Sequence, residues 1–178
     1  MSRGATWTNS DGLVVGFGTR DSKNNNGATV RTQGNVEILQ MILDYDNLPA
    51  AAGTAPSSKS IPIPANAVIK SAYLQTITDW ATGDSATLDI GLVNSAGTAI
   101  SQDGIDAAIA ASALDTGDTV VCDGAYIGID VGTSDAYISC EVNTGSFTTG
   151  QSQLTIEYIK GPDSTTPADP ITSIVGSL

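Results

Sequence analysis

The chain has 178 residues, 40% of them hydrophobic, with 7 basic residues, 19 acidic residues, no histidine and a net charge of −12. This length and apolar content fit one domain with its own core, and the acidic balance argues against nucleic acids and anionic membranes, which are bound through basic patches. Without histidine, neither a Ser–His–Asp nor a Cys–His pair can be built. We therefore expect no enzyme and no cofactor.

The two termini are expected to form arms. Residues 1–12 are polar apart from the lone aromatic Trp7, and residues 161–178 hold three prolines followed by a short apolar tail. The polar start predicts no signal peptide, and no run reaches the roughly 18 apolar residues of a membrane span. We therefore expect synthesis in a cytoplasm and one domain whose body covers residues 13–160.

The N-terminal region also differs in charge from the rest of the chain. Residues 1–36 hold four basic and two acidic residues, a net charge of +2, whereas the remainder holds three basic and 17 acidic residues, a net charge of −14. This asymmetry marks either a basic arm for an acidic partner or a chance placement of four charges. If it is an arm, the residues expected to dock or to form a subunit interface are Arg3, Trp7, Phe17, Arg20, Lys23 and Arg31.

Between the arms, short apolar runs separated by turn signals predict an all-β chain. The expected strands are Leu13–Phe17, Ala28–Thr32, Val36–Tyr45, Val68–Thr78, Ser85–Val93, Thr119–Cys122, Ala125–Val131, Ala136–Val142 and Gln153–Lys160. Val36–Tyr45 also fits a short helix, but the turn signals that flank it favour a strand. One short helix is expected at Ile105–Leu114, because alanines favour it and Asp103 or Asp106 can cap it. The pattern is typical of an antiparallel β-sandwich, with a jelly roll as the leading version.

Few residues offer chemistry. Cys122 and Cys140 lie in apolar runs and are expected to be buried thiols rather than a disulfide. Asp44, Asp46 and Asn47 begin like a calcium loop, but Leu48 and Pro49 occupy ligand positions, so no metal site is expected.

Aspartates beside Gly, Ser or Thr could in principle form a glycosidase pair, but they are expected to be turn residues. They are Asp84, Asp118, Asp123 and Asp135. Trp80 is either a core residue or, beside Asp79, a platform for a sugar.

The stretch Ile61–Val93 resembles a segment of the capsid decoration (cement) proteins of tailed phages. The matching residues are Pro64, Ala65, Asn66, Ala67, Val68, Ile69, Gly83, Ser85, Ala86, Thr87, Leu88, Ile90 and Gly91, and the run Ala107–Gly128 is also similar to that group. The resemblance implies a jelly roll or related sandwich, usually a homotrimer, that sits on the outer capsid surface where subunits of the major capsid protein meet. Both termini fall outside the matching region.

Two functions remain open on the sequence. The resemblance implies a virion protein, made in the bacterial host cytoplasm, that binds the outer shell and stabilises it through its arms. The alternative is a carbohydrate- or receptor-binding module of a phage tail or fibre, with Trp80, Tyr73, Tyr126 and Tyr137 as stacking residues.

Overall fold

In the computed structural model, residues 5–8, 14–17, 29–33, 36–58 and 60–160 are described, and side-chain surroundings are described from Val36 onward. The regular structure of these residues is almost entirely β-strand. They contain no α-helix, and so no helix long and apolar enough to cross a membrane. The strands are β1 (Ala5–Thr8), β2 (Val14–Phe17), β3 (Thr29–Gln33), β4 (Val36–Asp44), β5 (Val68–Thr82), β6 (Thr87–Val93), β7 (Ala99–Ala110), β8 (Thr119–Val121), β9 (Tyr137–Asn143) and β10 (Phe147–Ile159).

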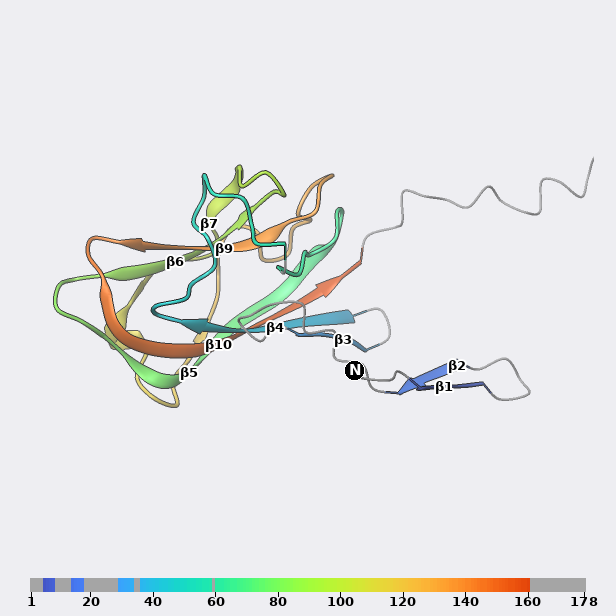
Figure 1. Ribbon diagram of the computed structural model, residues 1–178, viewed down its shortest axis with the longest axis horizontal. Helices are drawn as coiled ribbons and strands as arrows, with labels where there is room; N and C mark the ends of the chain where they lie inside the picture. The colour runs from blue at the N-terminus through green and yellow to red at the C-terminus, as the bar shows by residue number, and fades with distance from the viewer. Residues whose placement is uncertain (1–4, 9–13, 18–28, 34–35, 59, 161–178) are drawn as a thin grey trace, which may run out of the picture.

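Two antiparallel sheets face each other as the layers of a sandwich (Figure 1). The larger sheet has five strands in the order β3-β4-β10-β5-β8, and the smaller has three in the order β7-β6-β9. β1 and β2 pair with each other in a separate two-stranded ribbon. The predicted β-sandwich is therefore confirmed, with alternation between buried and partly exposed residues clearest along β4.

The strand order is that of a jelly roll. In an eight-stranded jelly roll, strands 1-8-3-6 form one sheet and strands 2-7-4-5 form the other. Here β4, β10, β5 and β8 correspond to jelly-roll strands 1, 8, 3 and 6 of the first sheet. In the second sheet, β9, β6 and β7 correspond to jelly-roll strands 7, 4 and 5. Position 2 is reduced to one bridge between Ile63 and Ala136, directly before β9. The IPIP run at Ile61–Pro64 explains this reduction, because prolines cannot donate ladder hydrogen bonds. β3 is an extra strand on the edge beside β4.

The core lies between the two sheets and is built mainly from aliphatic side chains. The fully buried members with large side chains are Leu39, Leu43, Ile63, Ile69, Leu74, Leu88, Ile90, Leu92, Ile105, Leu114, Leu154 and Tyr158. Cys122 and Cys140 are buried as free thiols, as predicted. Burial raises the pKa of both, and for Cys122 the value is about 12, so neither thiol ionises readily.

The helix predicted at Ile105–Leu114 is wrong. β7 continues to Ala110, and only the single 3₁₀ turn Ala111–Ala113 follows it. The partner of Leu88 is Ile109 and that of Ile90 is Asp106, so β7 holds one extra residue between two pairs on the same face. This bulge, where Ala108 has a φ of 53°, gives the buried residues a spacing of three, which imitates a helix.

The strand predicted at Ala125–Val131 is also wrong. Residues 125–128 form turns in which the Ile127 amide donates to the Gly124 carbonyl at 3.0 Å. The Tyr126 amide donates to the Gly104 carbonyl on β7 at 2.9 Å. The end of the segment pairs with β5 through only one isolated antiparallel bridge, between Asp130 and Val68. Tyr126 and Ile127 are apolar because they pack on the core from this turn.

Candidate functional site

Three strand ends of the larger sheet meet at one corner. Val36 begins β4, and its register partners are Gln33 at the end of β3 and Ile159 at the end of β10. Residues 161–178 follow β10 at this corner, whereas residues 1–28 precede β3 at Thr29, which lies opposite Gln40, four residues farther along β4. We call this region, made of Val36, Glu37, Tyr158, Ile159 and Lys160, the terminal corner.

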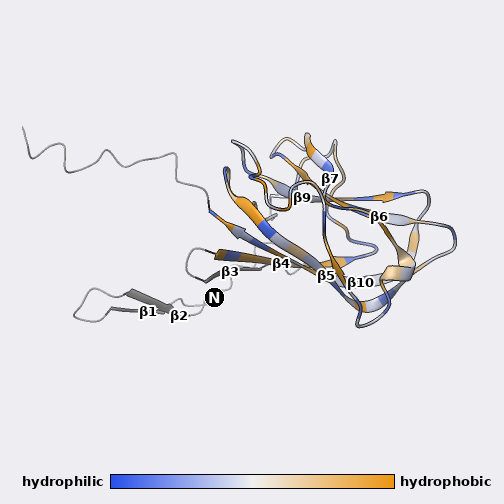
Figure 2. Ribbon diagram, turned by 180° about the vertical axis from the view of Figure 1, so that it is seen from behind, coloured by the Kyte–Doolittle hydropathy of each residue, from blue (hydrophilic) through white to orange (hydrophobic). Residues whose placement is uncertain are grey.

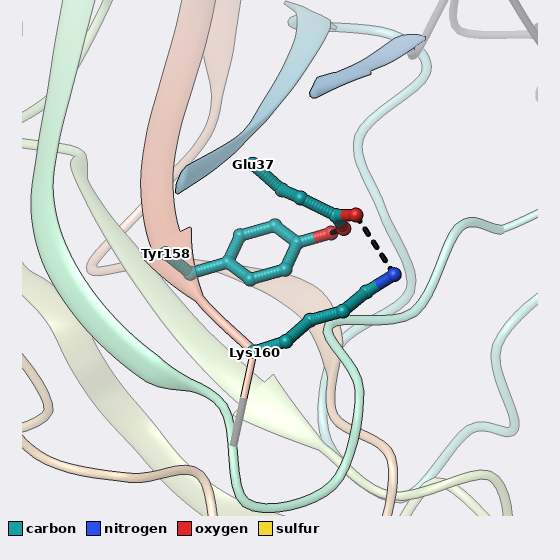
Figure 3. Close-up of polar contacts among 3 residues, drawn as sticks. All are labelled: Glu37, Tyr158 and Lys160. Carbon is teal, nitrogen blue, oxygen red and sulfur yellow. Dashed lines mark hydrogen bonds and ion pairs between the residues drawn. The ribbon is translucent and has the colours of Figure 1, made fainter. Parts of the chain in front are cut away.

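A polar trio closes the core at the terminal corner (Figure 3). Glu37 lies on the inward face of β4 and is only 9% exposed, directly opposite Tyr158 on β10. The Tyr158 hydroxyl donates to Oε2 of Glu37 at 2.8 Å, and Nζ of Lys160 lies 2.8 Å from Oε1 of the same carboxylate. Both oxygens of Glu37 thus have partners, as a buried carboxylate requires.

Each member of the trio has a distinct environment. Tyr158 is buried, and this burial together with the neighbouring Glu37 carboxylate raises the pKa of its hydroxyl. Lys160 is 59% exposed and covers the carboxylate from the solvent side. Lys160 directly follows β10, so its ion pair with Glu37 ties the end of this strand to β4.

Sequence reasoning did not identify Glu37 or Tyr158 as a site. The signal was nevertheless present, because Glu37 shares its alternation with Leu39, Met41 and Leu43, all of which are buried. An acidic residue in phase with a buried set predicts a buried carboxylate with a dedicated partner. The identity of that partner requires the register between β4 and β10, which local patterns do not contain.

The six predicted docking residues are distributed as follows. Trp7 in β1 is opposite Val15, and Phe17 in β2 is opposite Ala5. These two aromatic residues therefore lie on the two paired strands of the same ribbon. Arg31 lies in β3 opposite Ile38, two residues along β4 from the terminal corner. Arg3, Arg20 and Lys23 lie outside the described residues, as does the predicted C-terminal arm. The docking role of all six stays a prediction.

The opposite end of the sandwich, which we call the far end, consists of residues 44–47, 79–86, 111–118 and 143–150. It holds six aspartates and no lysine or arginine: Asp44, Asp46, Asp79, Asp84, Asp115 and Asp118. The terminal corner, by contrast, has Lys160 and the edge-strand residue Arg31 nearby, and residues 1–36 carry a net positive charge. Among the described residues, the far end is therefore more acidic than the terminal corner, where Glu157 and Asp130 accompany Lys160 and Arg31.

Far-end aspartates accept hydrogen bonds from their own loops. Asp79 accepts from the amide of Thr116 at 2.6 Å and from its hydroxyl, and the pKa of Asp79 is lowered by these bonds. The Thr82 hydroxyl donates to Asp84 at 2.7 Å, which together with the Ser146 amide lowers the pKa of Asp84. Asp44 accepts from the Gln151 amide group at 2.9 Å. These contacts confirm the prediction of turn and loop aspartates for Asp84.

The other predicted candidates have structural surroundings. Trp80 is 3% exposed, donates from Nε1 to the Ser152 hydroxyl at 2.8 Å and packs edge-on against Phe147 with ring centroids 4.8 Å apart. Its use as a sugar platform is therefore wrong, and its prediction as a core residue is confirmed. In the described part of the chain, no group of three or more His, Cys, Asp or Glu side chains is placed to hold a metal ion.

No family profile and no curated protein matches this sequence. Among solved structures, a chain of the acidic stable capsid of Helicobacter pylori bacteriophage KHP30 is 9% identical, with a TM-score of 0.47 over 72% of this chain and 90% of that chain. A chain of the cyanophage Pam1 capsid asymmetric unit is 15% identical, with a TM-score of 0.44 over 78% of this chain and 97% of that chain. At these TM-scores and identities, neither likeness carries an argument about function.

Proposed function

We propose that this protein is a virion structural protein that binds the outer surface of a phage capsid shell and stabilises it, as a cement protein does. The observation that carries the proposal is the charge contrast between the N-terminal segment and the far end. Six aspartates gather at the far end, whereas residues 1–36 carry a net charge of +2 and join the larger sheet through its edge strand β3. An acidic shell surface would attract the N-terminal segment and repel the far end, which gives docking a single orientation.

The proposed mechanism is mechanical rather than chemical. The N-terminal segment, with Arg3, Arg20, Lys23 and Arg31, would lie across the seam between subunits of the major capsid protein. Trp7 and Phe17 would add apolar anchors, because isolated aromatic residues make strong interface contacts. Three linked copies would multiply weak contacts through effective concentration. The resemblance of Ile61–Val93 to cement proteins supports the same function.

The test is co-sedimentation of the purified protein with phage shells that lack it. We expect saturable binding at micromolar protein, and we expect decorated shells to release their DNA at a higher temperature than bare shells. The variant Arg3→Gln/Arg20→Gln/Arg31→Gln should lose most of this binding. Salt screens the attraction between exposed arginines and an acidic surface, so the binding of the unaltered protein should also weaken as the salt concentration rises.

A matched control separates the local effect from the total charge. Ser85→Glu/Ser112→Glu/Ala113→Glu changes the net charge by the same three units, but at exposed residues of the far end. The control should bind shells like the unaltered protein. Shell binding that is absent from the unaltered protein, or equal losses in both triple variants, would contradict the proposal.

A further inference from the structure

Four of the six glutamines of the chain lie on the outward face of the larger sheet. Each stands between two buried residues of its own strand, so its side chain points away from the core. These glutamines are Gln40 on β4, Gln75 on β5, and Gln151 and Gln153 on β10. Register places Gln153 directly opposite Gln75, which in turn lies opposite Thr119 on β8.

Two adjacent rows of this face contain no Asp, Glu, Lys or Arg. One row consists of Gln40, Thr155, Tyr73 and Val121, and the next consists of Ile42, Gln153, Gln75 and Thr119. Acidic residues occupy the flanking rows, with Asp44 on one side and Glu157 on the other. In a chain with a net charge of −12, an uncharged strip between acidic rows admits an uncharged ligand and repels an anion.

Two of the glutamine amides are available to a ligand. Gln40 and Gln151 donate from their amide nitrogens to neighbouring side-chain oxygens, at 3.4 and 2.9 Å respectively. In the described part of the chain, the side chains of Gln75 and Gln153 have no such partner. Each of these amides offers two N–H donors and an oxygen acceptor. Opposite residues on antiparallel strands have Cβ atoms about 4.5–5.5 Å apart, so both amides can bind one small ligand.

Apolar side chains lie beside the two amides. Tyr73 precedes Gln75 by two residues on β5, so both side chains leave the same face of the strand, and Tyr73 is 36% exposed. Its register partner Val121 is 76% exposed. Figure 2 shows apolar and polar residues alternating along β5. The strip therefore combines an exposed ring with groups that both donate and accept hydrogen bonds.

We propose that the residues Tyr73, Gln75, Thr119 and Gln153, which we call the amide patch, bind a neutral carbohydrate. The faces of a sugar ring carry C–H groups, which can pack on the electron-rich face of the Tyr73 ring. The hydroxyls at the edge of a sugar donate and accept hydrogen bonds, as the glutamine amides and the Thr119 hydroxyl do. The uncharged strip and its acidic flanks select a neutral sugar over an acidic one.

The size of the strip also favours a small ligand over a protein. From the usual spacing of strands and residues, its two rows extend roughly 15 Å across four strands and roughly 7 Å along them. This area is on the order of 100 Å², whereas a stable protein interface buries roughly 800 Å² on each partner. The inference goes beyond shell binding and does not depend on it.

An array of oligosaccharides, probed with the purified full chain, tests the inference. It should hold neutral chains of glucose, galactose, mannose and N-acetylhexosamines, together with chains that contain sialic or uronic acids. We expect saturable binding to at least one neutral chain, and acidic chains should bind at least about tenfold more weakly. In calorimetry with the bound sugar, Tyr73→Ala and Gln75→Leu should each weaken binding by about tenfold or more. Tyr73→Phe keeps the ring and should keep most of the affinity.

The matched controls are Tyr45→Ala and Gln102→Leu, which alter exposed residues of the same types outside the amide patch. Both should bind the sugar like the unaltered protein, with circular dichroism showing that every variant is folded. The inference is overturned if no neutral chain is bound, if acidic chains bind equally well, or if controls and patch variants lose the same affinity. A protein that binds shells but no sugar overturns only this inference, and one that binds sugar but no shells overturns only the proposed function.

Discussion

At the far end of the sandwich, Trp80 and Phe147 close the core with two aromatic rings, and the nearby Asp79 and Asp84 are exposed, one near the end of β5 and one on the loop that follows it. At the terminal corner, the core is closed by a carboxylate, a phenol hydroxyl and an ammonium group, with Glu37 inside the layer of buried residues. The core is thus closed by packed aromatic rings at one end and by hydrogen bonds and an ion pair at the other.

This difference indicates where each end is vulnerable. An aromatic closure depends on volume, so it fails when a ring is removed. A polar closure depends on partners, so it fails when one hydrogen bond is removed and a buried oxygen is left alone. The corner is also where β10 ends, so the polar contacts there hold the end of this strand against β4.

The largest effect is expected from removing the indole at the far end. Trp80→Ala should lower the free energy of unfolding by about 3–5 kcal/mol, because a buried ring is lost from its packing against Phe147. Trp80→Phe should cost less, roughly 1–2 kcal/mol, because it keeps a ring but loses the hydrogen bond to Ser152. Urea unfolding followed by circular dichroism measures both. A loss below about 1 kcal/mol for Trp80→Ala would show that the aromatic pair does not close this end.

At the terminal corner, removing one oxygen atom tests the polar lock. Tyr158→Phe should lower the free energy of unfolding by about 1–3 kcal/mol, because it leaves Oε2 of Glu37 without its phenol donor in a buried site. Tyr45→Phe removes the same atom from an exposed tyrosine and should change stability by no more than about 0.5 kcal/mol. Equal losses in the two variants would mean that the trio has no special role.

Local patterns were sufficient for the fold class but not for the details of β7. The regular alternation in β4, β6 and β10 indicates strands because their inward residues face one core. The alanines and capping aspartates at Ile105–Leu114 misled because β7 pairs with β6 there through a bulge, and a bulge is a property of a pair of strands rather than of one segment. Alanine propensity there was overridden by tertiary pairing.

The same limit applies to the candidate site. The buried phase of Glu37 was visible in the alternation of β4, but Tyr158 becomes its partner only through a register that spans most of the chain. Charge asymmetry between residues 1–36 and the remainder was countable from the sequence, whereas the gathering of six aspartates at the far end required the strand order.

A smaller effect is expected from the exposed member of the trio. Lys160→Met should lower the free energy of unfolding by no more than about 1 kcal/mol, because water screens an ion pair whose lysine side chain is 59% exposed. The loss should shrink further at high salt, where the ion pair is screened. Lys70→Met, at an exposed lysine of β5, is the control and should change little. A loss as large as that of Tyr158→Phe would show that Lys160 and not Tyr158 holds the carboxylate.

The two ends should also affect stability at opposite ends of the pH range. We expect the far end to contribute to the loss of stability at low pH. Hydrogen bonds from Thr116 and Thr82 lower the pKa of Asp79 and Asp84 below the ordinary value of 3.8. A lowered folded-state pKa stabilises the fold above the unfolded pKa, and this contribution is lost as pH falls through the folded value. Asp79→Asn/Asp84→Asn should therefore flatten the decline of stability below pH 4. Asp115→Asn, the far-end control, should leave that decline unchanged.

We expect the terminal corner to contribute to the loss of stability at high pH. Because burial and the Glu37 carboxylate raise the pKa of Tyr158 above its ordinary value of 10.0, the unfolded state releases this proton first as pH rises. The stabilisation is complete below pH 10 and is lost as pH rises toward the folded value. Tyr158→Phe should remove this alkaline decline and leave the acid decline intact, and the paired aspartate variant should do the reverse. Urea midpoints measured across both limbs would show one shared response if the two ends were not chemically distinct.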